Sequence, residues 1–248
     1  MIIIKTMEEI EKMRAAGKIL AECHQHIEKM LRPGLSTWEI DQFAENFLLS
    51  KGATPEQKGY HGYPYATCAS VNDVICHGFP KREPLQDGDI VTIDMVVNLD
   101  GWLADSAWSY GIGTISDTAA KLLHTTKESL FKGIEQAVAG NRIGDVAHAI
   151  QVFAESHGYS VVRDFIGHGI GSEMHEAPQV PHYGPAGKGP LIKEGMVFTI
   201  EPMLNTGSFR TKIDADGWTA RTIDGGLSAQ YEHTLAVTPQ GTIILTQL

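Results

Sequence analysis

Two stretches of this chain, Gly88-Asp-Ile-Val-Thr-Ile-Asp94 and Gly195-Met-Val-Phe-Thr-Ile-Glu201, align without a gap at an offset of 107 residues. Each begins at a glycine, continues as an apolar run typical of a buried strand, and ends on a carboxylate. His61-Gly62 and His168-Gly169 repeat at the same offset. We therefore interpret the chain as an internal duplication.

Helical patterns repeat with almost the same spacing. Apolar residues recur at i, i+3, i+4, i+7 and i+8 from Ile40 and again from Val146, 106 residues later, which predicts one buried face on each helix. A capping box that starts at Ser36 precedes the first of them. We expect two longer helices before these, at 7–31 and 118–137.

Strand-like segments follow the helices in both halves, at 71–75, 90–97, 102–108, 197–202, 229–237 and 243–246. Runs of helices followed by runs of strands, twice over, predict an α+β fold with a mostly antiparallel sheet covered on one face by helices. No linker rich in serine, glycine or proline separates the halves. We therefore expect one domain over 1–248, built from half-repeats at roughly 1–112 and 113–248.

Composition excludes several classes of function. The 248 residues carry 30 acidic and 20 basic side chains and no run of three lysines or arginines, which argues against a nucleic-acid binder. The three cysteines form no Cys-x-x-Cys pair, so a disulfide framework or zinc ribbon is not expected. Without a signal peptide or a long apolar run, we expect a cytoplasmic protein with no membrane partner.

Two aspartates interrupt what is otherwise a core strand pattern. A hairpin centred between Leu99 and Asp100 would place Asp94 directly opposite Asp105, where like charges are destabilising. A bound cation would offset this repulsion. The alternative is that one aspartate caps the turn and the other is exposed.

The second half favours the cation. Glu201 takes the place of Asp94 in the repeat, and Glu232 lies in the strand-like segment 229–237, with no lysine or arginine close by in either strand. Burying four unpaired carboxylates is prohibitive, and His168, between two glycines, can add a nitrogen ligand. Four carboxylates and one imidazole suit two divalent ions such as Mn, Fe, Co or Zn, and hence two-metal hydrolysis.

The same residues lie in longer motifs, which are Gly59-Tyr-His-Gly-Tyr63, Ser70-Val-Asn-Asp-Val-Ile-Cys-His-Gly78, Asp89-Ile-Val-Thr-Ile-Asp94, Gly101 to Asp105, Gly167-His-Gly-Ile-Gly171, His175-Glu-Ala-Pro178, Thr199-Ile-Glu-Pro-Met203 and Gln230-Tyr-Glu-His-Thr234. Together they resemble the type I methionine aminopeptidases, which have the pita-bread fold, over essentially the whole chain. The resemblance implies removal of the initiator methionine from nascent proteins and peptides whose second residue is small.

The resemblance also implies roles for single residues. Its metal ligands fall on the five residues already reached, namely Asp94, Asp105, His168, Glu201 and Glu232. Asp105 and Glu232 would bridge two ions, and Glu201 would also shuttle the proton of the attacking water. His77 would contact the scissile amide, and His175 would hydrogen-bond the carbonyl oxygen as it becomes an oxyanion.

Further residues follow from the same resemblance. Those expected around the methionine side chain are Tyr60, His61, Tyr63, Cys68, Phe198 and Trp218. A monovalent cation is expected on backbone oxygens near Asn72, Val74 and Ser228. The chain departs from the common bacterial pattern at Gln57, where a cysteine often stands, and at Met174, where an aromatic residue is common.

Two other functions share part of this pattern. X-Pro aminopeptidases and prolidases use the same five ligands but usually carry a large N-terminal domain, whereas only about 60 residues precede Tyr60 here. A catalytically inactive binding module of the same fold typically loses ligands, and all five are present. We expect a monomer that acts on peptide N-termini beginning with Met and contacts the ribosome transiently.

Overall fold

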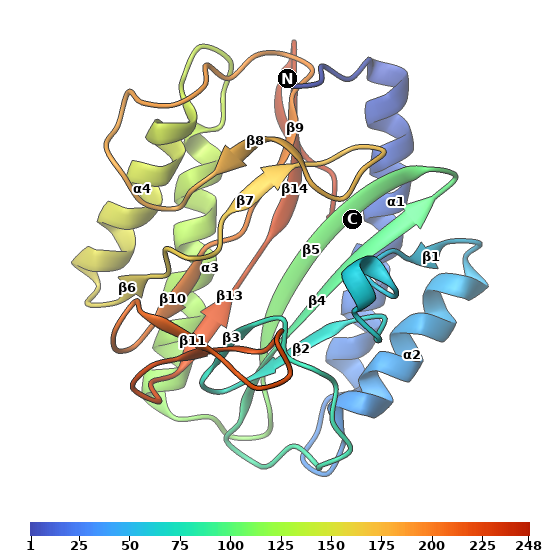
Figure 1. Ribbon diagram of the computed structural model, residues 1–248, viewed down its shortest axis with the longest axis vertical. Helices are drawn as coiled ribbons and strands as arrows, with labels where there is room; N and C mark the ends of the chain where they lie inside the picture. The colour runs from blue at the N-terminus through green and yellow to red at the C-terminus, as the bar shows by residue number, and fades with distance from the viewer.

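Two pairs of helices flank a central set of strands in the computed structural model, which describes all 248 residues (Figure 1). The helices are α1 (Met7–Met30), α2 (Thr37–Ser50), α3 (Asp117–Gln136) and α4 (Ile143–Ser156), with a 3-10 turn η1 at Tyr60–Gly62. The predicted helices are confirmed to within one residue at each end where bounds were given. Ser36 and Glu39 form the predicted capping box at the start of α2, so local sequence fixes where this helix begins.

The strands are β1 (Thr54–Pro55), β2 (Cys68–Val71), β3 (Val74–Cys76), β4 (Ile90–Leu99), β5 (Trp102–Gly111), β6 (Ser160–Val161), β7 (Gly167–Gly169), β8 (Glu176–Val180), β9 (Val197–Ile200), β10 (Met203–Asn205), β11 (Thr211–Ile213), β12 (Ala220–Thr222), β13 (Ser228–Gln230), β14 (His233–Thr238) and β15 (Gly241–Ile244). All paired strands are antiparallel, as predicted.

Two predicted strands are each broken in two. Asn72, with φ of 54°, separates β2 from β3, and Glu232 lies in the gap between β13 and β14 rather than inside a strand. At that gap the Glu232 N–H donates to the carbonyl of Ala107 on β5 at 2.8 Å. The break therefore lets the second half of the chain attach to the long hairpin of the first half.

The predicted register of the β4–β5 hairpin is wrong by one residue at its turn. Asp94 pairs with Ala107, and Asp105 pairs with Val96. Asp100 and Gly101 form the two-residue turn, with φ of 53° and 85°, and this turn type requires positive φ at both positions. Moving the centre by one residue moves each partner by two, so the aspartates stay on one face as diagonal neighbours.

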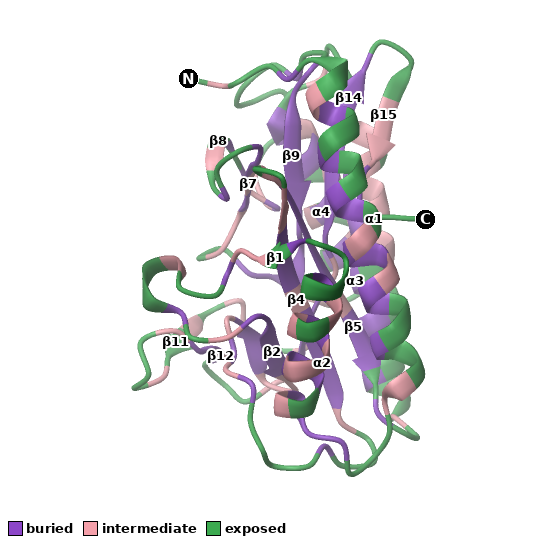
Figure 2. Ribbon diagram, turned by 90° about the vertical axis from the view of Figure 1, so that its right-hand side faces the viewer, coloured by how far each residue is buried: buried purple, intermediate pink, exposed green.

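Helices cover one side of the strands. α1 lies along one face of β4 and β5, whereas β7, β8, β11 and β12 project on the opposite side (Figure 2). The largest buried cluster joins α1 and α2 to β4 and β5, and a second one joins α3 and α4 to β9 and β14. No helix combines the length and apolar character needed to cross a membrane. The candidate site residues gather on the uncovered side.

Candidate metal centre

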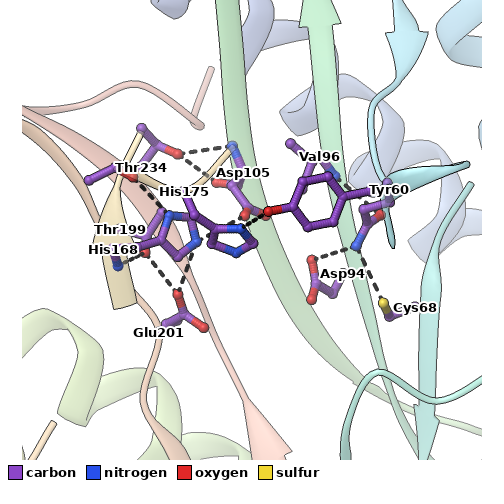
Figure 3. Close-up of polar contacts among 12 residues, drawn as sticks. Tyr60, Cys68, Asp94, Val96, Asp105, His168, His175, Thr199, Glu201 and Thr234 are labelled. Atoms are coloured by element: carbon purple, nitrogen blue, oxygen red, sulfur yellow. Dashed lines mark hydrogen bonds and ion pairs between the residues drawn. The ribbon is translucent and has the colours of Figure 1, made fainter. Parts of the chain in front are cut away.

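One cavity of about 260 Å³ is lined by all five predicted metal ligands. Asp94 and Asp105 enter it from β4 and β5, and His168 and Glu201 face them from β7 and the end of β9 (Figure 3). Glu232 reaches the same cavity from the gap between β13 and β14. The structure thus brings together side chains that are up to 138 residues apart in the sequence.

Two measured distances between these candidate ligands fit a shared ion. Ligand atoms of Asp105, His168 and Glu232 all lie within 4.8 Å of one another. His168 Nε2 is 3.6 Å from Asp105 Oδ2 and 3.7 Å from Glu201 Oε1. Since a divalent ion holds nitrogen and oxygen ligands at about 2.0 to 2.2 Å, two ligands of one ion are at most about 4.4 Å apart. The last two separations meet that limit.

Electrostatics make the site unfavourable without a cation. Burial raises the pKa of Asp105 to about 7 and that of Glu201 to about 8. Burial, and then the charge of neighbouring carboxylates, raises the pKa of Asp94 and Glu232 well above the usual range. No lysine or arginine lines the cavity. Asp105 Oδ1 and Glu232 Oε1 are buried without any hydrogen-bond partner, as expected for oxygens that face a metal ion.

Neighbouring groups orient the ligands. His168 Nδ1 lies 3.0 Å from its neighbouring carbonyl, that of Gly169, which leaves Nε2 free to bind a metal. Thr199 Oγ1 accepts from the His168 N–H at 3.0 Å and donates to Glu201 Oε1 at 2.8 Å. His182 Nε2 accepts from the Glu201 N–H at 3.1 Å. Sequence reasoning missed Thr199 and His182, although alternation along β9 places Thr199 on the same face as Glu201.

Two further histidines, His77 and His175, line the cavity. Desolvation lowers the pKa of His77, and desolvation together with His168 lowers the pKa of His175. Both imidazoles are therefore neutral at pH 7 and each carries one N–H donor. His175 lies at the cavity mouth, where its Nδ1 is 2.8 Å from the Tyr60 hydroxyl.

The predicted methionine pocket is only partly assembled. Tyr60, Tyr63, Cys68 and Trp218 line the cavity. Phe198 does not, because it is fully buried in the core cluster of the second half, on the face of β9 opposite Thr199. His61 is exposed on η1, with its ring 4.3 Å from that of Tyr60.

Other residues complete the wall. Gln57 and Met174 line the cavity, and the Gln57 amide lies 3.3 Å from Cys68 Sγ and 3.5 Å from Asp94 Oδ1. Lining residues that sequence reasoning did not single out are Cys76, Val96, Asp164, Phe165, Ile166, Met203 and Gln230. Most are carried by short loops and strands with no periodic pattern, so their position depends on the tertiary fold.

The three residues expected near a monovalent cation lie close together. The Ser228 N–H donates to the Asn72 carbonyl at 2.9 Å, and Val74 begins the strand that follows Asn72. Ser228 Oγ is buried without a hydrogen-bond partner. The structure thus brings the three residues together and leaves one buried hydroxyl oxygen unpaired among them.

Comparison with known proteins agrees with this geometry. Residues 11–239 match the metallopeptidase family M24. The chain is 49% identical over 248 residues to methionine aminopeptidase 1 of Bacillus subtilis, with complete coverage of both chains. It is 51% identical over 246 residues to the methionine aminopeptidase of Clostridium perfringens, with 99% of each chain covered.

Solved structures give the same result. The methionine aminopeptidase of Rickettsia prowazekii superposes with a TM-score of 0.98 at 44% identity, over 99% of this chain and 100% of that one. The prolidase of Pyrococcus furiosus gives 0.81 at 23% identity, covering 99% of this chain but 66% of its own, which shows a shared fold alone. The pita-bread architecture predicted from sequence is confirmed, and the chain belongs to metallopeptidase family M24 and, within it, to the methionine aminopeptidases.

Proposed function

We propose that this chain removes the N-terminal methionine from peptides and nascent proteins whose second residue is small. The observation that carries the proposal is a single cavity that combines five metal-ligand side chains with two neutral histidines and an aromatic wall. Full-length relatives at about 50% identity are named methionine aminopeptidases, which supports the choice of substrate.

The residues present fit two divalent ions. Asp94, Asp105 and Glu232 would hold one, and Asp105, Glu232, His168 and Glu201 the other. When bound, such a pair lowers the pKa of a water molecule and polarises the scissile carbonyl. Mn, Fe, Co and Zn all suit this donor set.

The other groups would act on the substrate directly. Glu201 accepts a hydrogen bond from Thr199 and lies within 3.4 Å of the Gln230 amide. It would take a proton from the attacking water and deliver it to the leaving amine. His77 and His175 would donate N–H hydrogen bonds to the scissile amide and to the developing oxyanion.

The cavity wall supports methionine as the first residue. Tyr63 and Trp218 pack edge to face, with ring centroids 5.1 Å apart, and Cys68 and Met203 add polarisable sulfur. Flexible thioether side chains pack well against aromatic rings and sulfur. An enclosed wall of this kind favours an unbranched apolar side chain over a charged one.

Prolidase activity is the main alternative, because that fold shares the ligand set. The solved prolidases match at 22 to 23% identity, against 49 to 51% for the methionine aminopeptidases, so the latter substrate is favoured. We further propose that one domain carries the activity as a cytoplasmic monomer that meets nascent chains at the ribosome. A monovalent cation would bind at Asn72, Val74 and Ser228.

The decisive experiment removes metal with a chelator, restores Mn, Co or Fe, and offers Met-Ala-Ser beside Ala-Pro-Ala. We expect methionine release that depends on the added metal and no cleavage of the second peptide. Cleavage of Ala-Pro-Ala alone would instead identify an X-Pro aminopeptidase, and no hydrolysis with any metal would indicate a binding module.

A further inference from the structure

A buried ion pair ties the N-terminal segment to the strand behind the cavity. Lys5 Nζ lies 2.5 Å from Glu176 Oε2, and the two side chains are only 3% and 6% exposed. Other lysine pairs lie at the surface, for example Lys12 with Glu8, at 50% and 81%. The Lys5 N–H also donates to the Gly195 carbonyl at 2.7 Å. Lys5 is therefore held at both its backbone and its side chain.

Glu176 lies next to two residues of the candidate site. It directly follows His175, begins β8, and pairs with Gly169 on β7, one residue from His168. A Cβ atom on Gly171 would overlap both Lys5 Nζ and Glu176 Oε1, so the chain after His168 packs tightly over the ion pair. The ion pair therefore packs directly against the backbone of the segments that carry His168 and His175.

Lys5 is the ion-pair partner on which Glu176 depends. Glu176 Oε1 is buried and has no hydrogen-bond partner, so Lys5 alone compensates the carboxylate. A buried charge that loses its partner is strongly destabilised. Without Lys5, no contact holds the Glu176 side chain at its place, and the backbone of His175 loses the anchor beside it.

The side chain of His175 has little else to hold it. Its one hydrogen bond is to the hydroxyl of Tyr60 at 2.8 Å, and Tyr60 belongs to the short turn η1 at the cavity mouth. Its ring also touches that of His168, with centroids 4.3 Å apart. Backbone anchoring through Glu176 is thus the main rigid constraint on where His175 points.

We infer that Lys5 is a positioning residue: its buried ion pair with Glu176 fixes the segment that aims His175 into the cavity. This inference rests on the proposed function, in which His175 donates a hydrogen bond to the reacting carbonyl. Misplacement of such a group by about 1 Å lowers turnover by about 100-fold. We therefore expect Lys5→Met to lower kcat by about 10- to 100-fold with KM nearly unchanged.

A double-mutant cycle tests the inference on the metal-loaded protein with Met-Ala-Ser, at a temperature where circular dichroism shows each variant folded. The variants are Lys5→Met, His175→Ala and the two combined, with Lys12→Met as the matched surface control. We expect Lys5→Met to cause no further loss of kcat once His175 is absent, and the control to retain wild-type kcat. Losses that multiply in the combined variant, or wild-type kcat in Lys5→Met, would overturn the inference.

A second variant separates positioning from simple stability. Replacing both charges in Lys5→Met/Glu176→Met removes the unpaired carboxylate, so the urea midpoint should recover relative to Lys5→Met, while kcat should stay low. Recovery of kcat together with the midpoint would mean that the pair only holds the fold, and would overturn the inference. Failure of the proposed function is visible separately, as wild-type kcat in His175→Ala alone.

Discussion

The two halves of the chain start alike and then differ. Gly88 and Gly195 each lie two residues before their strand, with φ of 95° and 81°, and a carboxylate follows six residues after each glycine. In the first half β4 runs on past Asp94 to Leu99, whereas in the second half β9 ends before Glu201, and Pro202 follows. Since proline cannot donate to a sheet, the second copy ends its strand at the carboxylate, whereas the first copy continues into a long hairpin.

The two halves also differ in the position of the histidine that each copy carries. His61 and His168 are repeat partners, yet His61 is exposed on a turn with φ of 46°, whereas His168 lies on β7 among the carboxylates. The duplication therefore preserves the carboxylate on the core strand but not the imidazole. The two histidines therefore have different local backbones, a 3-10 turn for His61 and a strand for His168.

The largest expected effect tests this asymmetry directly. Asp94→Ala and Glu201→Ala should each lower kcat/KM by about 1000-fold or more, and the double variant should be little worse, because the groups act as one unit. His61→Ala should change kcat/KM less than threefold. The measurement is steady-state hydrolysis of Met-Ala-Ser. A large loss of kcat/KM in His61→Ala would show that the two histidines have equivalent roles and would contradict the comparison.

Without metal, the carboxylates of both halves should make the stability of the protein depend on pH. Because the pKa values of Asp105 and Glu201 rise to about 7 and 8 on folding, the metal-free folded state binds more protons than the unfolded chain between about pH 4 and 8. Its free energy of unfolding should thus fall as pH rises through that window, by about 1.4 kcal/mol per pH unit for each group that titrates.

Urea midpoints in chelator at pH 5 and pH 8 measure this loss, and saturating Mn should remove it. Asp105→Asn from the first half and Glu201→Gln from the second should each flatten the dependence. A metal-free protein that is equally stable at both pH values would show that the carboxylates are not desolvated as described.

A smaller effect, on stability alone, is expected from alanine substitutions at Gly88 and Gly195. A Cβ on Gly195 would contact Ile4 Cγ2 at 2.5 Å and the Lys5 carbonyl at 2.8 Å, whereas on Gly88 the nearest atom is 3.7 Å away. Both alanine variants share the positive-φ strain, so Gly195→Ala should be the less stable by about 1 to 3 kcal/mol, the usual cost of overpacking. Equal urea midpoints would contradict this packing of the N-terminal segment.

The smallest effect concerns a histidine of the first half alone. His24 on α1 is fully buried, and desolvation lowers its pKa to about 3. The unfolded chain binds a proton below about pH 6.5 that the folded chain rejects, so stability falls as pH falls. Glutamine cannot titrate. Between pH 6.5 and 5.5 the free energy of unfolding of the metal-loaded protein, measured by urea titration, should therefore fall by about 1 kcal/mol less in His24→Gln than in the wild type. Equal decreases in the two proteins would show that His24 is not held neutral.

The sequence predicts those parts of the site that lie on regular elements. Asp94 and Asp105 follow from apolar strand patterns, and the capping box and helical stripes fix α2. The predicted turn is misplaced although the sequence holds the signal: Asp100 and Gly101 tolerate the positive φ that both adopt, whereas a turn at Leu99 and Asp100 would require positive φ at a leucine. Phe198 was misassigned although alternation with Thr199 already separates their faces.

Contacts made by tertiary structure alone were not predictable in this way. His182 reaches the Glu201 N–H from a segment without a regular element, and Lys5 meets Glu176 across 171 residues. Neither pairing leaves a periodic or spacing signal, because each depends on how the two halves and the N-terminal segment pack.

The two halves of the chain meet where the Glu232 N–H donates to the Ala107 carbonyl, and the candidate site is built from both. Asp94 and Asp105 come from one copy of the repeat, and His168, Glu201 and Glu232 from the other. A protein with one copy would have to associate with a second molecule to complete the proposed ligand set, and its cellular concentration would limit that association. Joining the copies in one chain replaces that concentration by an effective one in the millimolar range, so that the site assembles in every folded molecule.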